Sequence, residues 1–434
     1  MARLETGEEV RAADRAHVLH SWSIQSELDP VAVAGGEGSR FWDYDGKKYL
    51  DFGSQSVSLN VGHQHPRLVA AIKEQAERLC TISPKFANDA RSELARLLAE
   101  VTPGDLMRTF FTNGGAEANE SAIKLARWYT GRQKIVARYR SYHGATAGAA
   151  SLTGDSRRWP TEPGIPGVVR LLDPYEYRCP AGHPDPCPVC SGAPHLEEVL
   201  SHENPETVAA VVLETVTGAN GVIVPPDGYL RSIREVCDRH GILLVLDEVM
   251  AGFGRTGRWF ACEHWEVVPD ILTLAKGINS GYVPLGAMVI SERLSDWIFD
   301  RPFQTGLTTS GHPLACASGA ESIETLRDEG LVEQAQALGE VVAKELHGLA
   351  ERHDRIGDVR GLGLLWGIEL VSDRKSREPL DARPIAKEAL ARGLHLFVRG
   401  NVVLVAPPLV ISREDLAEGL ALLDEVLDRD YLYR

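Results

Sequence analysis

Residues 242–247 read Ile-Leu-Leu-Val-Leu-Asp, a continuous apolar run that ends in a single acid. Such runs are typical of strands that are buried on both faces of a parallel sheet. Similar runs alternate with helix-length segments between Met107 and Ile290, which predicts an α/β fold with helices on both faces of the sheet. The expected strands are Met107–Phe111, Lys134–Ala137, Val208–Leu213, Ile242–Leu246, Ile271–Leu274 and Gly286–Ile290.

Helical periodicity surrounds and follows these strands, with apolar residues every three or four positions. The Gly-punctuated run 361–370 is typical of a strand after a turn and begins a smaller α+β unit, whereas the Pro- and Gly-rich segment 157–194 predicts a loop. We expect residues 1–60 to contribute to this smaller domain, residues 61–325 to form the large domain and residues 326–434 to complete the small one. The expected helices are Ala118–Tyr129, Tyr229–His240 and Leu331–His353, and Asp43–Lys47 is expected to be a hairpin turn.

The composition limits the class of partner. Apolar residues make up 44% of the 434 residues, and no apolar run approaches the roughly 18 residues of a membrane span. The net charge of −15 disfavours nucleic-acid phosphate and anionic membrane surfaces as partners. Seven scattered cysteines argue against a disulfide framework, and the first residues show no secretion or transit signal. We therefore expect a cytoplasmic protein that acts on small molecules.

Three features that follow predicted strands carry the candidate chemistry. Asp247 places a carboxylate at the C-terminal end of a strand, where ligands bind in open α/β sheets. Lys276 follows the next strand in an apolar, Gly-rich setting, where partial burial lowers the pKa of the amine and leaves it nucleophilic. The segment 113–120, Asn-Gly-Gly-Ala-Glu-Ala-Asn-Glu, opens a helix whose free N–H groups are able to hold a phosphate. Taken singly, each has a plainer explanation, such as an acid that caps a loop or a Gly-Gly turn. Taken together, they match pyridoxal phosphate (PLP), which needs a phosphate cradle, an acid at its ring nitrogen and a lysine at its aldehyde.

Six short motifs occur in order between about Phe41 and Ile411. They are Phe110–Glu120, Tyr142-His143-Gly144, Asp247-Glu248-Val249, Gly252–Gly257, Ala275-Lys276-Gly277 and Thr309–Pro313. Together they resemble the class III (omega) aminotransferases of fold type I. This resemblance implies PLP as cofactor and a large domain, built on a mainly parallel seven-stranded sheet, beside a smaller α+β domain.

The resemblance also implies roles for residues around the cofactor. Lys276 falls on the Schiff-base position and Asp247 on the partner of the pyridine nitrogen. Gly115 and Ala116 match the phosphate-binding pair, whose second member is usually Ser or Thr, so Ala116 keeps only its backbone N–H. The expected phosphate-binding site therefore lacks a side-chain hydroxyl at position 116.

The resemblance assigns further contacts to both ring faces and to a second subunit. Tyr142 corresponds to the aromatic residue that stacks on the ring, His143 follows it as a further cofactor contact, and Val249 packs on the other face. Glu214 matches a cofactor-site acid, although the chain reads Glu-Thr-Val where relatives have Glu-Pro-Val. Thr308 corresponds to a hydroxyl that reaches the phosphate of a neighbouring subunit, which implies a homodimer or a dimer of dimers with shared active sites.

Three residues are candidates for the substrate pocket beside Tyr142. Arg399 corresponds to the arginine that grips a substrate carboxylate, and a bidentate guanidinium suits a 2-oxo acid; a surface arginine is the alternative, because the following turn is shorter than in some relatives. Val57 stands where many relatives carry a pocket tryptophan. Trp22 is either an aromatic wall of the substrate entrance or a packing residue.

Four potential metal ligands lie in the Pro-rich segment, namely Cys179, His183, Cys187 and Cys190. The Cys-x-x-Cys pair with two further ligands resembles half of a zinc site. The spacing is irregular and the expected reaction needs no metal, so we expect a loop of free thiols and no metal, with zinc as the alternative.

The resemblance implies an aminotransferase that moves an amino group from a primary amine or an omega-amino acid to pyruvate or 2-oxoglutarate in a ping-pong sequence. Taurine, β-alanine and diamines are the expected donors, because the overall similarity is to omega-amino-acid aminotransferases. A decarboxylase, racemase or aminomutase on the same fold is the alternative. The same cofactor set serves all of these reactions.

Overall fold

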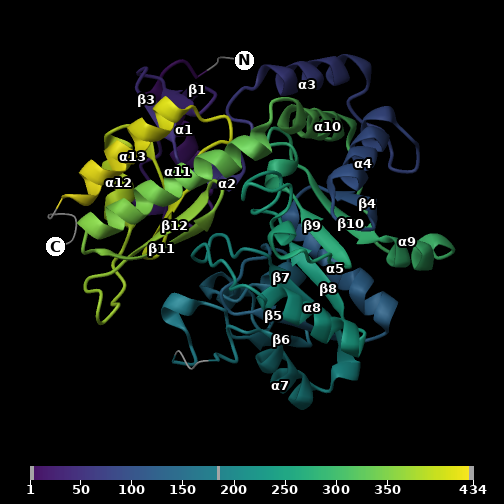
Figure 1. Ribbon diagram of the computed structural model, residues 1–434. Helices are drawn as coiled ribbons and strands as arrows, with labels where there is room; N and C mark the ends of the chain where they lie inside the picture. Colours follow the sequence, from purple (N-terminus) through teal and green to yellow (C-terminus); the bar gives the residue numbers. More distant parts are fainter. Residues whose placement is uncertain (1–3, 183–185, 430–434) are drawn as a thin grey trace.

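The computed structural model describes residues 4–182 and 186–429, and its largest element is a seven-stranded sheet (Figure 1). The strand order is β4-β10-β9-β8-β7-β5-β6. The neighbouring pairs β9–β8, β8–β7, β7–β5 and β5–β6 are parallel. Strand β10 runs antiparallel to both of its neighbours, β4 and β9. The predicted α/β class with a mainly parallel sheet is therefore confirmed. The strands are β4 (Leu106–Thr112), β5 (Lys134–Arg138), β6 (Val168–Leu171), β7 (Val208–Glu214), β8 (Leu243–Asp247), β9 (Ile271–Leu274) and β10 (Gly286–Ser291).

Helices bury both faces of this sheet. Along β7, Val211 and Leu213 pack in one buried cluster with α8, whereas Val212 packs in the opposite cluster with α5. This alternation explains the continuous apolar runs, because successive side chains of a strand point in turn to one helical layer and then to the other, and both layers are apolar. The helices of this region are α3 (Pro66–Arg78), α4 (Asp89–Val101), α5 (Gly115–Thr130), α6 (Ala147–Leu152), α7 (Ala193–Glu203), α8 (Tyr229–His240), α9 (Glu292–Phe299) and α10 (Pro313–Asp328). Nowhere in the described ranges does a helix combine the length and apolar character needed to cross a membrane.

The segment 157–194 is more ordered than the sequence predicts. The structure forms β6 inside it, paired with β5 at the edge of the sheet. The prediction of a loop was wrong here because β6 has only four residues and includes Arg170, so no apolar run marks it. Short 3₁₀ turns also occur in the chain: η1 (Gln25–Glu27), η2 (Ser156–Thr161), η3 (Glu176–Arg178), η4 (Pro205–Thr207), η5 (Ala261–Trp265) and η6 (Lys276–Ile278).

Two smaller sheets lie together at the upper left of Figure 1. One combines strands from both ends of the chain, and the other contains C-terminal strands alone. The predicted hairpin turn at 43–47 joins β2 to β3, and the run 361–370 holds the end of one strand, a turn at Gly363 and a second strand. The strands are β1 (Val33–Glu37), β2 (Arg40–Asp43), β3 (Lys48–Asp51) and β13 (Leu394–His395) in one sheet, and β11 (Ile356–Leu362), β12 (Leu365–Leu370), β14 (Phe397–Arg399) and β15 (Val402–Val405) in the other. The helices are α1 (Gly7–His17), α2 (Ser54–Val57), α11 (Leu331–Arg352), α12 (Arg383–Ala391) and α13 (Arg413–Leu427).

Arg255 joins the large sheet region to both ends of the chain. Its buried guanidinium donates hydrogen bonds to Asn60 Oδ1 at 2.9 Å and to the carbonyl oxygen of Leu364 at 3.2 Å. Burial lowers the pKa of this guanidinium to about 9. Through Arg255, the Gly252–Gly257 motif thus links the large sheet region to the smaller sheets. The sequence did not indicate this role.

Candidate active site

The carboxyl ends of neighbouring parallel strands bring the predicted site residues together. Glu214 ends β7 and pairs in register with Asp247 at the end of β8, and Asp247 pairs with Thr273 of β9. Lys276 follows β9 directly, and Gly115 begins α5 after β4. Glu214, Asp247, Lys276 and Gly115 line a cavity of about 400 Å³. Its walls include Ser58, Asn113, Gly114, Gly115, Ala116, Tyr142, His143, Gly144, Glu214, Asp247, Val249, Met250, Lys276 and Asn279.

Asp247 is held by three hydrogen bonds and is only 4% exposed. Its Oδ2 accepts from Asn119 Nδ2 and lies opposite His143 Nδ1, each at 2.8 Å, and its Oδ1 accepts from the Val249 N–H at 3.0 Å. Thr273 Oγ1 in turn donates to Asn119 Oδ1 at 2.8 Å. The carboxylate is therefore fixed in orientation. Asn119 stands in the quoted Phe110–Glu120 motif, but no sequence signal indicated that it contacts Asp247.

Lys276 occupies an unusual backbone conformation beside the cavity. Its φ of 44° lies in the left-handed region, which costs a non-glycine residue about 1 kcal/mol or more. Burial lowers the pKa of its amine to about 8, against the opposing effect of the carboxylates of Glu214 and Asp247. Among the described residues, no acceptor forms a hydrogen bond or ion pair with this amine. The amine is therefore available to a molecule in the cavity.

The first turn of α5 offers a cradle for an anion. The N–H groups of Gly115 and Ala116 have no intrahelical partner, and the helix dipole favours negative charge there. A Cβ atom at Gly115 would lie 2.8 Å from Val249 Cγ2, so only glycine fits this close approach. Ala116 contributes no hydroxyl, as its sequence implies.

Glu214 uses both carboxylate oxygens to hold backbone. Oε1 accepts from the Tyr142 N–H at 2.9 Å, and Oε2 accepts from the Gly218 N–H at 2.8 Å. Burial raises the pKa of this carboxyl. Thr215, which replaces the family proline, donates through Oγ1 to the buried Glu248 at 2.8 Å. Glu214 thus positions the Tyr142 backbone at the cavity wall.

Charged and aromatic side chains gather around Tyr142. The Arg157 guanidinium lies over its ring at 3.8 Å from the centroid, and Trp22 makes an edge contact at 6.1 Å while remaining 67% exposed. Arg157 Nε donates to Asp155 Oδ2 at 2.9 Å, and Arg399 Nη2 lies 3.6 Å from the same oxygen. The sequence indicated Tyr142, Trp22 and Arg399 for this region. It missed Arg157, which begins the segment predicted to be a loop, and Asp155, which lies just before that segment.

Four predicted residues are absent from the described walls of this cavity, namely Trp22, Val57, Thr308 and Arg399. Trp22 contacts Tyr142, and Arg399 lines a second cavity. Val57 is 1% exposed and packs in the main core. The backbone of α2 is left-handed at Val57, and the next residue, Ser58, lines the cavity instead. Thr308 is exposed and contributes nothing to the described walls of this cavity. The role that the resemblance implies for Thr308, at the phosphate of a neighbouring subunit, stays a prediction.

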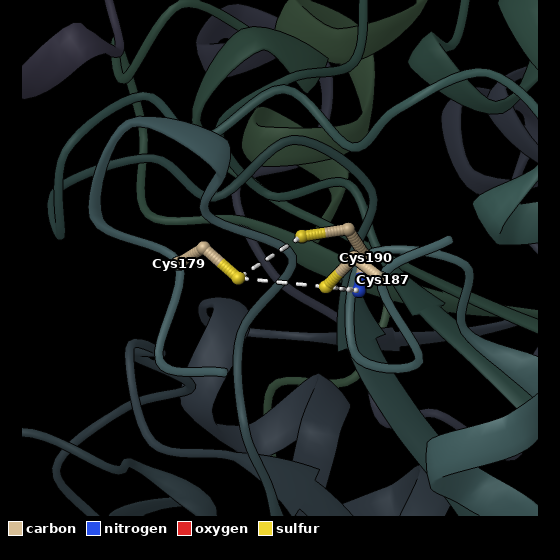
Figure 2. A group of neighbouring side chains, drawn as sticks. All are labelled: Cys179, Cys187 and Cys190. Carbon is tan, nitrogen blue, oxygen red and sulfur yellow. Dashed lines mark hydrogen bonds between the residues drawn. The ribbon is translucent and has the colours of Figure 1, made fainter. Parts of the chain in front are cut away.

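Three of the four candidate metal ligands converge outside this cavity. Figure 2 shows the sulfur atoms of Cys179, Cys187 and Cys190 directed toward one another. His183 lies outside the described residues. The three cysteines form no disulfide, and their sulfur atoms lie within 4.8 Å of one another. The expected absence of a metal stays a prediction.

The residues present fit PLP. The cavity combines an available amine at Lys276, an oriented carboxylate at Asp247 and the free first-turn N–H groups at Gly115, which are the donor and acceptor groups that its aldehyde, ring nitrogen and phosphate require. The Nε2 atom of His143, on the ring that contacts Asp247, is buried and has no hydrogen-bond partner among the described residues. A polar molecule in the cavity is consistent with this unsatisfied atom.

Comparison with known proteins identifies the family. The family profile described as aminotransferase class-III matches residues 23–427. The chain belongs to the class III aminotransferases. As a member it is a PLP-dependent transaminase, an enzyme that transfers the amino group of an amine to a 2-oxo acid.

Three proteins illustrate the range of relatives of this class III aminotransferase. The taurine:2-oxoglutarate aminotransferase of Bifidobacterium kashiwanohense, solved with PLP and glutamate, is 41% identical with a TM-score of 0.94, and the match covers 98% of each chain. A thermostable (S)-enantioselective omega-transaminase of Thermomicrobium roseum is 40% identical with a TM-score of 0.91, over 98% of this chain and 99% of that one. A leucine/methionine racemase of Thermococcus litoralis is 36% identical over 92% of this chain and 90% of its own.

Proposed function

We propose that this aminotransferase takes the amino group of an omega-amino acid or another primary amine and passes it to pyruvate or 2-oxoglutarate. The arrangement of Arg157, Asp155 and Arg399 beside Tyr142 carries this proposal. Asp155 is engaged by Arg157 at hydrogen-bond distance, whereas Arg399 at 3.6 Å is only loosely paired. Two guanidinium groups share one carboxylate, so one positive charge is left for the carboxylate or sulfonate of a substrate.

Similarity supports the omega-amino donor. The relative of 41% identity acts on taurine, whose sulfonate is an anion like the carboxylate of β-alanine. A fork-shaped guanidinium binds either group through paired oxygens. Taurine, β-alanine and diamines are therefore the first donors to test.

Each group in the cavity has a proposed role toward the cofactor. Lys276 would hold PLP through its amine, Asp247 would pair with the ring nitrogen, and Gly115 and Ala116 would donate backbone N–H groups to the phosphate. Tyr142 and Val249 would enclose the ring, with His143 orienting Asp247. Bound PLP supplies an electron-withdrawing ring that stabilises the electron pair left when a substrate C–H bond breaks.

Lys276 is also the proposed base for proton movement. Its lowered pKa of about 8 leaves a substantial neutral fraction near physiological pH, and a neutral amine is able to accept a proton from substrate carbon. Asp247 and Glu214 are fixed by their own hydrogen bonds and remain in place during this transfer. Release of the first product before the second substrate enters gives ping-pong kinetics, which parallel initial-rate plots would reveal and intersecting plots would refute.

We further propose a homodimer with shared active sites in a reducing compartment such as the cytoplasm. The exposed Thr308 supports the dimer, because a hydroxyl outside the described walls of its own cavity is available to a neighbouring subunit. None of the seven cysteines, all of which lie in the described ranges, forms a disulfide, which supports a reducing compartment. Light scattering during size-exclusion chromatography tests the dimer.

A donor panel tests the proposed reaction. Purified holoenzyme is incubated with taurine, β-alanine, a diamine or an aliphatic amine, each with pyruvate or 2-oxoglutarate, and alanine or glutamate is quantified. Lys276→Ala should reduce turnover by about 10²–10⁴-fold, the usual contribution of a positioned base, or more. Lys73→Ala, at an exposed helix position, is the matched control and should leave turnover unchanged.

Racemisation is the second candidate, because one relative of 36% identity is a leucine/methionine racemase. A racemase inverts an amino acid without any oxo acid. The test is to incubate the enzyme with L-leucine or L-methionine and no 2-oxo acid. Formation of the D-isomer, together with no amino transfer in the panel, would favour racemisation over the proposed amino transfer.

A further inference from the structure

Three cysteine sulfurs meet in the segment between β6 and α7 (Figure 2). Cys179 Sγ lies 3.4 Å from Cys187 Sγ and 3.9 Å from Cys190 Sγ. All three sulfurs lie within 4.8 Å of one another. Tetrahedral zinc with Zn–S bonds of about 2.3 Å places its sulfur ligands about 3.8 Å apart. We propose that the thiolates of Cys179, Cys187 and Cys190 bind a structural Zn²⁺ ion.

The backbone around Cys187 and Cys190 is already shaped for this purpose. The Cys190 N–H donates to Cys187 Sγ at 3.2 Å, and the Ser191 N–H donates to the Cys187 carbonyl at 2.9 Å. An N–H group directed at a sulfur stabilises the thiolate form and fixes the side-chain rotamer, as outer partners of metal ligands do. Two of the three ligands are therefore preorganised by one tight turn.

A disulfide accounts for the cluster less well. The 3.4 Å between the closest sulfurs far exceeds the S–S bond of about 2.05 Å, and any pairing would leave the third cysteine unmatched. Zinc engages all three. Binding forms three Zn–S bonds and releases three thiol protons to solvent, so three thiolates and one Zn²⁺ carry a net charge of −1. One position of the tetrahedron remains for a further ligand.

The proposed site would fasten a segment that contacts the smaller sheets. Arg178, next to Cys179, is ion-paired with Glu369 of β12 and donates to the Arg377 carbonyl at 2.7 Å. The guanidinium groups of Arg140 and Arg360 both contact the Tyr175 ring, at 4.9 and 4.6 Å from its centroid. The three cysteines are absent from the described walls of the cavity that Lys276 lines. The ion would therefore stabilise this contact and take no part in the transamination chemistry.

Metal analysis of the untagged holoenzyme, purified under reducing conditions without chelators, tests the proposal. We expect about one zinc per chain by inductively coupled plasma mass spectrometry. Cys187→Ser should reduce the zinc content at least tenfold, whereas Cys80→Ser, which removes an exposed cysteine outside the cluster, should leave it unchanged. Equal zinc loss in both variants would overturn the site.

Cobalt exchange keeps the test decisive if Cys187→Ser fails to fold. The wild-type enzyme, stripped of zinc and loaded with Co²⁺, should show the intense d–d bands of tetrahedral cobalt in the red region, at wavelengths where PLP does not absorb. Zinc removal should also speed proteolytic cleavage within 172–192 while the cofactor absorbance stays unchanged. A wild-type protein that takes up neither metal, or that holds a disulfide among these cysteines by peptide mapping, would refute the proposal.

Discussion

Asn119 Nδ2 donates a hydrogen bond of 2.8 Å to Asp247 Oδ2, inside a chain of contacts that also includes Thr273. Both side chains are almost completely buried. A hydrogen bond to a buried charged group contributes about 1.5–3 kcal/mol, so this contact helps both to stabilise the fold and to orient the carboxylate that would meet the cofactor ring.

Asn119→Ala should lower the free energy of unfolding by about 2 kcal/mol and reduce kcat about tenfold, because Asp247 loses a donor and a defined orientation. Urea denaturation and initial rates measure the two effects. Thr273→Val, which removes only the outer hydrogen bond, should give a smaller change in both. An Asn119→Ala enzyme with normal kcat and an unchanged cofactor spectrum would show that this contact is purely structural.

The rate of PLP binding to the apoenzyme should depend on the protonation of Lys276. The neutral amine is the nucleophile, so the second-order rate constant should rise with pH and level off above about 8, the pKa to which burial lowers this amine. Stopped-flow absorbance records the reaction. Glu214→Gln removes a carboxylate that raises this pKa, so the midpoint should move to lower pH. A profile still rising at the pH of an ordinary lysine would contradict the assignment.

Arg399→Ala should weaken the binding of a 2-oxo acid. The loss of a charge-assisted contact of about 1.5–3 kcal/mol should raise KM roughly ten- to a hundredfold, while kcat with an uncharged amine donor changes little. Arg399→Lys, which keeps the charge but not the forked geometry, should recover only part of the loss. If KM for pyruvate and 2-oxoglutarate is unaffected, Arg399 is a surface residue and Arg157 becomes the next candidate.

Ala116→Ser should strengthen cofactor binding. The added hydroxyl stands in the first turn of α5, where it would join the free N–H groups of the phosphate cradle and add about 1 kcal/mol, or roughly a fivefold decrease in Kd. Spectroscopic titration of apoenzyme with PLP measures Kd. Ala118→Ser, on the buried side of the same helix, is the control and should not tighten binding. An unchanged or weaker affinity in Ala116→Ser would argue against a phosphate at this turn.

The sequence alone determined the elements that repeat a strong pattern. The apolar run 271–274 and the periodic stretch 229–240 occur in the structure with the predicted limits, because buried strands and amphipathic helices impose their periods on adjacent residues. The sequence also placed Asp247 and Lys276 at strand ends, which the parallel topology brings to one edge. In contrast, β6 carries no apolar run, and it forms because β5 offers an unpaired edge.

Tertiary structure alone decided the contacts between residues distant in the chain. Asn119 meets Asp247, Arg157 covers Tyr142, and Val57 packs in the core, because these positions depend on how strands, loops and backbone bends are arranged in space. The three cysteines meet for the same reason, since local spacing gives no direction to a side chain in an irregular segment. The sequence is sufficient to locate a functional residue that directly follows a regular strand or helix. The tertiary structure is needed where a site depends on contacts between separate elements.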